Sequence, residues 1–260
     1  GVDEEGGTVN RISLYKQYRE VPFWSPRDLF DEGGMELIKS DTKEKCRLLS
    51  SLGINLNFAP VADISSDPAD YMYPRTFGIS AEETCKYVEN VVSVMKENGI
   101  GSVLKHFPGY GNNSDTHTGV AVDERSLKSL RENDFLPFES GIEAGAEVVL
   151  VSHNIVRSID GEHPASLSLQ VHNILRDEIG FSGLIITDDL YMDAIREYTH
   201  GQEAAVMAVL AGNDLLCCSD YQTQYPAVVQ ALKDGKISEN RVDESVMRIL
   251  QYKISMGLMN

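Results

Sequence analysis

The chain has 260 residues, 42% of them hydrophobic, and a formal net charge of −17 from 23 basic and 40 acidic side chains. This length suffices for one large core, either in a single barrel-type domain or in two small domains. An acidic surface repels phosphate backbones and anionic lipids, which argues against nucleic acid and membrane surfaces as partners. No run of about 18 apolar residues is present, so we expect no membrane insertion.

Short apolar runs alternate with amphipathic stretches along the chain. The runs are rich in Val, Ile and Leu and lack strict alternation, which is typical of buried parallel strands. They lie at residues 54–64, 101–109, 147–155, 183–190 and 213–218. Strands that alternate with helices predict a parallel α/β fold.

Three of the amphipathic stretches carry helix signals. The stretch at 80–99 begins with a capping box formed by Ser80 and Glu83 and ends at a glycine. The second begins at a candidate cap, Ser168, and the third covers residues 241–257. In each stretch the apolar residues recur on one helix face, which predicts helices that pack against a core.

Polar side chains gather where the apolar runs end. They are Asp3, Asp63, Lys105, His106, His153, Asn154, Asp188 and Asp189. Ligands of parallel α/β folds bind at the carboxyl ends of the strands, and a barrel directs all of these ends toward one centre. The pattern therefore favours a TIM-type (β/α)8 barrel over an open sheet. No linker, repeat or low-complexity segment divides the chain, so we expect one domain over residues 1–260.

Asp188 follows a buried apolar run directly, at the expected tip of a strand. A carboxylate in that place can act as a nucleophile, a base or a metal ligand. One of the two adjacent aspartates is expected to cap the next helix, and the position beyond the strand tip favours Asp189 for that role.

Asp115 and His117 are two residues apart, so in an extended segment their side chains project to the same side. A carboxylate bonded to an imidazole fixes its tautomer and raises its basicity. Such a pair is more often part of a polar turn than a catalytic dyad. The flanking Gly109, Gly111 and Gly119 favour the dyad, because they make a mobile loop plausible.

Lys105 and His106 end an apolar run, and burying a lysine without a role is costly. Donors at a strand tip can hold sugar hydroxyls or a phosphate, whereas the alternative is a lysine paired with a core carboxylate. Arg11 and Arg75 follow loop-like segments near strand ends. They are weaker candidates, because a solvated surface role is equally open to them.

Local metal and cofactor motifs are absent from the sequence. The six histidines form no H-E-x-x-H or H-x-H pattern, and no glycine-rich phosphate loop follows a strand. We therefore predict no metal and no cofactor. The four cysteines, two of them adjacent, fit neither a zinc site nor an ordinary disulfide framework, so we expect buried thiols.

Four segments together resemble the signatures of glycoside hydrolase family 3, in its bacterial β-N-acetylglucosaminidase (β-hexosaminidase) branch. They are VDEEGGTVNR (2–11), RTFG (75–78), KHFPGYGNNSDTH (105–117) and ITDDLYMDAI (186–195). The remainder, to Asn260, resembles the family's last strand and closing helices more loosely. Two departures from the family pattern are Tyr110, where many relatives have His, and Thr116 in place of Ser.

The resemblance implies a (β/α)8 barrel and a retaining exo-acting enzyme. Such an enzyme hydrolyses terminal N-acetylglucosamine from peptidoglycan- or chitin-derived oligosaccharides or muropeptides. Asp188 would be the nucleophile that forms a covalent glycosyl-enzyme, and His117 the general acid/base that Asp115 orients. The residues implied to grip the terminal N-acetylglucosamine are Asp3, Arg11, Arg75, Lys105 and His106.

Several functions stay open at this point. A histidine acid/base departs from the usual carboxylate pair of retaining glycosidases. Because it is neutral when deprotonated, it repels an anionic acceptor less, which also permits a phosphorylase with phosphate in place of water. Two further alternatives are a non-catalytic sugar-binding remnant of the same fold, against which the intact Asp188, Asp115 and His117 argue, and a metal-dependent hydrolase on the same barrel.

The start of the chain bears on the predicted barrel. Relatives carry two further strand–helix units before the VDEEGG strand, so we expect this barrel to lack its first two βα units. Another chain could supply them, or the remaining strands rearrange, or the protein is impaired. The chain begins at Gly1 without a methionine, as if cut from a precursor, which leaves the compartment open between cytoplasmic and secreted or cell-surface. The oligomeric state is equally open.

Overall fold

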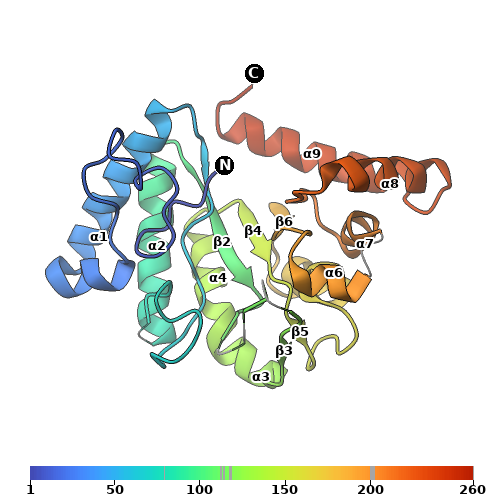
Figure 1. The fold of residues 1–260 in the computed structure, drawn as a ribbon, viewed down its shortest axis with the longest axis horizontal. Coiled ribbons are helices and arrows are strands. Elements are labelled where there is room, and N and C mark those ends of the chain that lie inside the picture. The colour runs from blue at the N-terminus through green and yellow to red at the C-terminus, as the bar shows by residue number, and fades with distance from the viewer. Residues whose placement is uncertain (79, 112, 114, 117–118, 200–202, 260) are drawn as a thin grey trace. The chain divides into compact units, whose positions relative to one another are not determined.

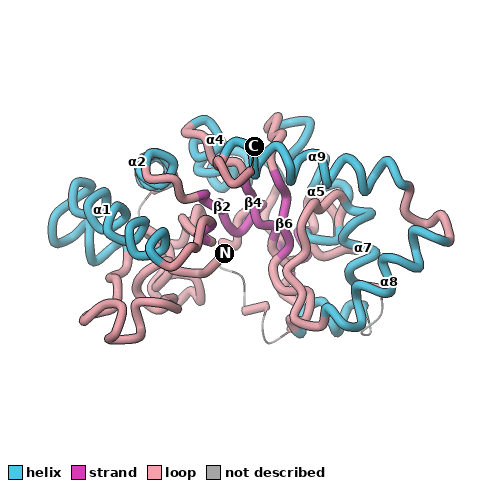
Figure 2. The backbone as a smooth tube through the Cα atoms, turned by 90° about the horizontal axis from the view of Figure 1, so that it is seen from above, coloured by secondary structure: helices cyan, strands magenta, loops and turns pink. Residues whose placement is uncertain are grey.

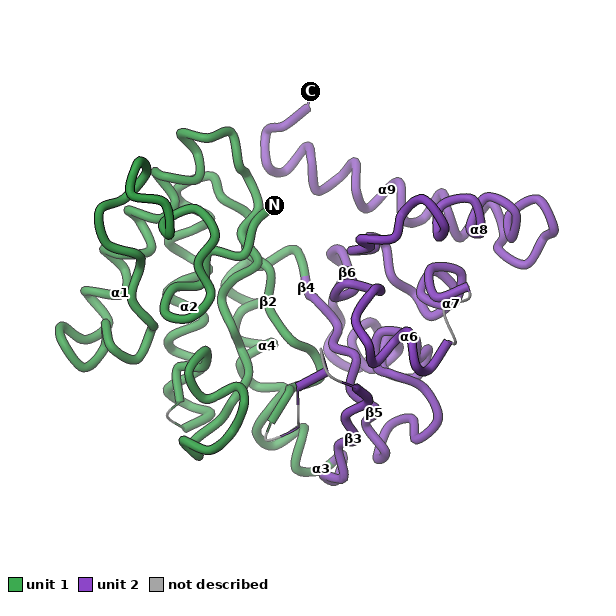
Figure 3. The backbone as a smooth tube through the Cα atoms, in the orientation of Figure 1, with its two compact units in different colours: residues 1–112, 128–148 green, residues 113–127, 149–260 purple. Residues whose placement is uncertain are grey.

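The structure, a computed structural model, describes residues 1–78, 80–111, 113, 115–116, 119–199 and 203–259. The chain divides into two compact units, coloured separately in Figure 3. Unit 1 comprises residues 1–112 and 128–148, and unit 2 comprises residues 113–127 and 149–260. A single barrel domain over the whole chain stays a prediction.

Unit 1 is built around two short parallel strands, β1 (Leu56–Asn57) and β2 (Gly101–Phe107). They pair with Leu56 opposite Gly101, and every residue of β2 is buried. Two further parallel bridges extend this arrangement: Val61 with Lys105 continues the pairing with β2, and Val2 with Asn57 adds the N-terminal segment beside β1. The bridges bring the segments that end in Asp3, Asp63 and Lys105 side by side, as expected for neighbouring parallel strands.

Helices of unit 1 lie beside these strands, some of them in direct contact with β2. They are α1 (Pro26–Ser51), α2 (Ala81–Glu97), α4 (Phe135–Glu143) and the π-helical turn η1 (Leu130–Asp134), with the short α3 (Leu127–Ser129) leading into η1. In Figures 1 and 2, α2 lies between α1 and α4 and beside β2. The predicted cap of α2 is confirmed, since the Ser80 hydroxyl accepts from the Glu83 N–H at 3.3 Å. Gly141 of α4 permits close packing, because a Cβ there would lie 2.7 Å from Leu104 of β2.

Unit 2 contains two further strand pairs. The strands are β3 (Val122–Asp123), β4 (Val148–Val151), β5 (Ile155–Val156) and β6 (Leu184–Thr187), and all of β4 except Val148 belongs to this unit. β3 pairs with β5 in parallel, and β4 is the neighbour of β6. Every residue of β4 and β6 is buried, as their unbroken apolar runs predict.

The helices of unit 2 lie between and after these strands in the chain. They are η2 (Ala165–Leu167), α5 (Leu169–Asn173), η3 (Ile174–Glu178), α6 (Asp193–Thr199), α7 (Ala204–Ala211), α8 (Tyr221–Lys233) and α9 (Glu239–Ser255). Ala204, Ala205 and Ala208 of α7 pack against Leu190 and Ile195. The predicted cap Ser168 is confirmed, since its hydroxyl accepts from the Val171 N–H at 3.3 Å.

Some sequence-based expectations differ from the structure. The predicted strand at 213–218 forms only one parallel bridge, between Leu215 and Ile186. Beyond that bridge the Cys217 N–H donates to the Thr187 hydroxyl, so a side chain replaces the next strand hydrogen bond. The helix predicted at 241–257 is present as α9, but none of its residues is buried. The four cysteines are free, yet only Cys46 is buried, so the expectation of four buried thiols was wrong.

The α/β fold with parallel strand pairing is as predicted. In the part of the chain that the structure describes, no helix has the length and apolar character needed to span a membrane.

Candidate functional site

Unit 1 contains a connected cluster of charged side chains at its strand ends. The Lys105 Nζ lies 2.7 Å from Asp3 Oδ1 and 2.5 Å from Glu5 Oε1. The Arg75 guanidinium contacts the same carboxylate, with Nη2 2.7 Å from Glu5 Oε1 and Nε 3.1 Å from Oε2. The Lys105 side chain is 2% exposed and that of Glu5 3%, whereas Asp3 is 41% exposed. The cluster therefore reaches the surface through Asp3.

Burial and charge compete at Glu5. Burial by itself raises the pKa of this carboxyl group, but the charges of Lys105 and Arg75 outweigh it and bring the pKa to about 2, from 4.5. Burial lowers the pKa of Arg75, and the Glu5 carboxylate outweighs that effect and raises it. Glu5 and Arg75 are therefore an ion pair at every pH near neutrality.

The His106 ring extends this cluster. Its Nε2 lies 3.3 Å from Arg75 Nη2, and its Nδ1 lies 2.6 Å from Asp63 Oδ2. A guanidinium only donates, so Nε2 carries the lone pair and Nδ1 carries the proton that Asp63 accepts. Asp63 also accepts the backbone N–H groups of His106 at 3.1 Å and Tyr110 at 2.7 Å. One fully buried carboxylate thus sets both the tautomer and the orientation of the ring.

Four of the five predicted sugar-binding residues meet in this cluster: Asp3, Arg75, Lys105 and His106. The fifth predicted sugar-binding residue, Arg11, lies outside this cluster. It is exposed, and its guanidinium donates to the Asn10 carbonyl at 3.2 Å. We did not predict Glu5 or Asp63 as site residues. The position of Asp63 at a strand end was a usable signal, and so was the two-residue spacing between Asp3 and Glu5.

Unit 2 contains the predicted nucleophile. Asp188 directly follows β6, and its N–H donates to the Val151 carbonyl at 3.3 Å. Its half-buried carboxylate accepts from the Asp189 N–H at 2.8 Å. Asp189 instead accepts from the backbone N–H groups of Tyr191 at 2.9 Å and Ser219 at 3.0 Å. Asp189 therefore holds the turn before α6 rather than capping the helix, because neither N–H group belongs to α6 (Asp193–Thr199).

His153 joins the end of β4 to this turn. Its buried ring lies between the Ser166 hydroxyl, 2.8 Å from Nδ1, and the Asp189 carbonyl, 3.1 Å from Nε2. A carbonyl only accepts, so Nε2 donates to it and Nδ1 accepts from Ser166. His153 thus fixes the backbone next to Asp188, a role that its place at a strand end did not reveal.

The segment with Asp115 also belongs to unit 2. Asp115 is half-buried, and the carbonyl of the buried Thr116 accepts from the Ala194 N–H of α6 at 3.3 Å. Further along, the buried Asp123 carboxylate binds the Arg125 guanidinium and anchors the end of the loop. The predicted acid/base His117 lies outside the described residues.

The charged cluster of unit 1 can bind a ligand that carries hydroxyl groups. Asp3, Lys105 and Arg75 offer acceptors and donors in one cluster, and a sugar hydroxyl needs both. Within the described ranges, no three His, Cys, Asp or Glu side chains come together as ligands of a metal ion would.

The fold and these groups define an α/β protein whose parallel strands end in polar side chains, where parallel α/β folds bind their ligands. The chain belongs to glycoside hydrolase family 3: residues 1–252 match the family model described as Glycosyl hydrolase family 3 N terminal domain. The resemblance inferred from the four sequence segments is thereby confirmed.

Relatives and solved structures agree with this family. The chain is 32% identical over 265 residues to the beta-hexosaminidase LpqI of Mycobacterium tuberculosis, covering 97% of this chain and 67% of LpqI. A family 3 β-N-acetylglucosaminidase structure from Paenibacillus sp. str. FPU-7 matches with a TM-score of 0.91 and 32% identity, over 98% of this chain and 49% of that one. The Thermotoga maritima β-N-acetylglucosaminidase matches with a TM-score of 0.83 and 27% identity, over 99% and 55%. This chain thus spans about half to two thirds of their length.

Proposed function

We propose that this protein is a retaining exo-β-N-acetylglucosaminidase that releases terminal N-acetylglucosamine from peptidoglycan- or chitin-derived glycans. The observation that carries the proposal is the cluster of Asp3, Lys105, Arg75 and His106, in a chain whose relatives are named beta-hexosaminidase and β-N-acetylglucosaminidase. The match to those structures also supports a second proposal, that both units belong to one TIM-type (β/α)8 barrel domain.

In this proposal unit 1 grips the terminal sugar. The exposed Asp3 carboxylate accepts from a hydroxyl group, while Lys105 and Arg75 donate to hydroxyl oxygens. Arg11 is exposed and completes the set that the family signature implies. Desolvated ionic donors and acceptors discriminate strongly between sugars, because a missing hydroxyl leaves a charged group unpaired.

Unit 2 carries the bond-breaking groups of the proposed reaction. Asp188 attacks the anomeric carbon, and the glycosidic bond breaks as His117 protonates the leaving oxygen. In the second step His117 removes a proton from water, which attacks the same carbon and releases Asp188. Asp115 orients His117. Asp188 directly follows β6, whereas the Asp189 carboxylate binds the N–H groups of Tyr191 and Ser219, which favours Asp188 as the nucleophile.

One assay separates this function from a phosphorylase and from a sugar-binding protein. The protein is incubated with p-nitrophenyl N-acetyl-β-glucosaminide, with and without phosphate, and the sugar product is identified. We expect free N-acetylglucosamine under both conditions. Formation of the sugar 1-phosphate would instead indicate a phosphorylase. Calorimetric binding of N-acetylglucosamine without p-nitrophenol release would indicate a non-catalytic sugar-binding protein, and neither binding nor release would refute the proposal.

A further inference from the structure

Three acidic residues, Asp3, Glu4 and Glu5, stand in a row, yet their carboxylates have different partners. Asp3 and Glu5 both contact the Lys105 ammonium. Glu4 instead accepts backbone N–H groups of the segment 11–13 at 2.7 to 3.1 Å. Successive side chains of extended backbone point to opposite sides, so residues 3 and 5 share one side and residue 4 takes the other.

The two carboxylates that share a side differ in exposure. Asp3 is 41% exposed and can contact a ligand, whereas Glu5 is 3% exposed and contacts both cations. Glu5 binds the Arg75 guanidinium through both oxygens, a bidentate geometry that fixes the plane of the guanidinium. An ammonium has three donors, and Asp3 and Glu5 take two of those on Lys105, which defines the direction of the third.

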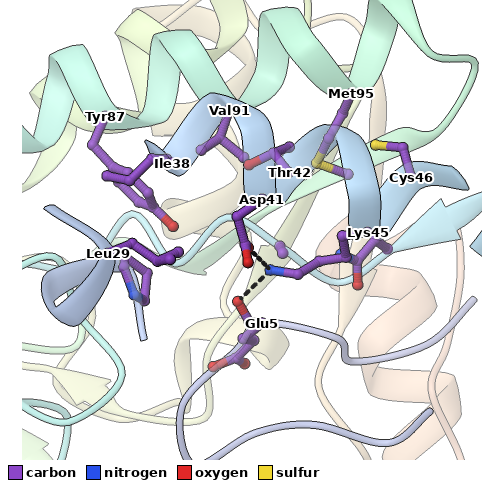
Figure 4. A pocket seen from close by; sticks show the side chains of 13 residues that line it. Glu5, Leu29, Ile38, Asp41, Thr42, Lys45, Cys46, Tyr87, Val91 and Met95 are labelled. Atoms are coloured by element: carbon purple, nitrogen blue, oxygen red, sulfur yellow. Dashed lines mark hydrogen bonds and ion pairs between the residues drawn. The ribbon is translucent and has the colours of Figure 1, made fainter. Parts of the chain in front are cut away.

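Glu5 is itself held firmly from the other end. Its carbonyl accepts from the Lys45 Nζ at 2.9 Å, and this Nζ lies 3.4 Å from Asp41 Oδ2. Figure 4 shows the Lys45 ammonium between Asp41 and the Glu5 carbonyl, with the Glu5 carboxylate at the opposite end of the residue. The next residue, Gly6, has a φ of 106°, and a Cβ there would lie 2.2 Å from the Trp24 carbonyl oxygen. The backbone that presents Glu5 therefore has little freedom.

We propose that Glu5 is a positioning residue, which orients Arg75 and Lys105 so that their remaining donors meet the hydroxyl groups of the bound sugar. It contacts both cations and does not itself touch the sugar. This inference rests on the proposed function of the same site and adds a residue that the function does not otherwise need. A side chain that holds a binding group by charge-assisted hydrogen bonds restricts it to the productive geometry.

The test compares Glu5→Gln with Asp214→Asn. Each substitution neutralises a buried carboxylate that pairs with an arginine. Asp214 belongs to unit 2 and pairs with Arg176, Arg241 and Arg248, none of which belongs to the sugar-binding cluster, so Asp214→Asn controls for the general effect of losing a buried charge.

The first measurement needs no sugar. In the intact protein, the Arg75 Nε–H donates to the buried Glu5 carboxylate and should exchange slowly with solvent in 15N NMR spectra. The signal is assigned by its absence in Arg75→Lys. Glu5→Gln should speed this exchange about tenfold or more, the factor that corresponds to one charge-assisted hydrogen bond. Asp214→Asn should leave it unchanged.

The second measurement is kinetic. With p-nitrophenyl N-acetyl-β-glucosaminide, Glu5→Gln should lower kcat/KM by about 10²-fold, the loss expected when a binding group shifts by about 1 Å. The loss should appear mainly in KM, because the sugar hydroxyls are held both before and during bond cleavage. Asp214→Asn should keep the KM of the unmodified protein.

Each outcome decides whether Glu5 positions the two cations. Slow Arg75 exchange in Glu5→Gln overturns the inference, and so does fast exchange with an unchanged KM. If the unmodified protein cleaves no N-acetylglucosaminide, the proposed function fails, and the exchange rate alone decides whether Glu5 orients Arg75. If Glu5→Gln does not fold, Glu5→Asp is measured instead. It retains the charge but withdraws the carboxylate by one methylene, so it should still raise KM, and an unchanged KM overturns the inference.

Discussion

Replacing Asp63 by Asn should separate the orientation of His106 from the presence of its ring. The Asp63 side chain is fully buried and accepts from three N–H groups: the His106 Nδ1 at 2.6 Å, the His106 backbone at 3.1 Å and the Tyr110 backbone at 2.7 Å. An asparagine side chain has one acceptor oxygen and one NH2 group. It can therefore still accept from Tyr110, but its NH2 group then faces two donors of His106.

The size of the effect follows from these contacts. Hydrogen bonds to a charged group contribute about 1.5–3 kcal/mol each, and a buried donor without an acceptor costs about 1–3 kcal/mol. We expect Asp63→Asn to lower the free energy of unfolding by about 2–4 kcal/mol. The His106 proton should move to Nε2, which then faces the donors of Arg75 at the present distance of 3.3 Å. Losing that contact should reduce kcat/KM by about 10- to 100-fold, since each tenfold corresponds to about 1.4 kcal/mol.

Urea unfolding and turnover of p-nitrophenyl N-acetyl-β-glucosaminide provide the two measurements. The matched control is Asp160→Asn in unit 2, because Asp160 also accepts two backbone N–H groups and a histidine Nδ1, that of His163 at 3.0 Å. Asp160→Asn should lower the free energy of unfolding by less than Asp63→Asn does, because the His163 side chain is 37% exposed. It should leave kcat/KM unchanged. An unaltered kcat/KM in Asp63→Asn would refute this reasoning, as would an equal loss of activity in the control.

The remaining predictions concern the reaction, the core and pH. Asp188→Ala should abolish trapping of a glycosyl-enzyme by a fluorinated substrate in mass spectrometry, and normal turnover by this variant would refute its role. His117→Ala should impair substrates with poor leaving groups more than activated aryl glycosides, and equal losses would contradict an acid role. The buried Asp214 carboxylate pairs with three arginines, so Asp214→Ala should lower the free energy of unfolding by about 3–5 kcal/mol, against less than about 1 kcal/mol for the exposed Asp193→Ala. Burial raises the pKa of Glu5, but the adjacent cations outweigh burial and bring the pKa to about 2 from 4.5, so its contribution to stability should be complete above pH 4.5 and lost as the pH falls toward 2. The difference in unfolding free energy between the unmodified protein and Glu5→Gln should shrink across that interval.

Local sequence patterns determined the elements and their ends. Ser80 caps α2 because its hydroxyl and the Glu83 N–H are three residues apart, a spacing that any helix start brings together. The buried strands β2, β4 and β6 follow from unbroken apolar runs, and Asp188 stands at a strand tip because its run ends there. The family, too, was readable in four short segments, because their residues and order are specific.

Tertiary structure alone decided which charged groups meet. Glu5 and Arg75 are 70 residues apart, and Asp63 and His106 are 43 apart, so no local period relates them. Their contacts depend on which segments become neighbours and in what register, and a change of one residue in register would turn each side chain to the other face. The same reason explains α9, whose apolar pattern predicted a helix correctly but could not say that none of its residues would be buried.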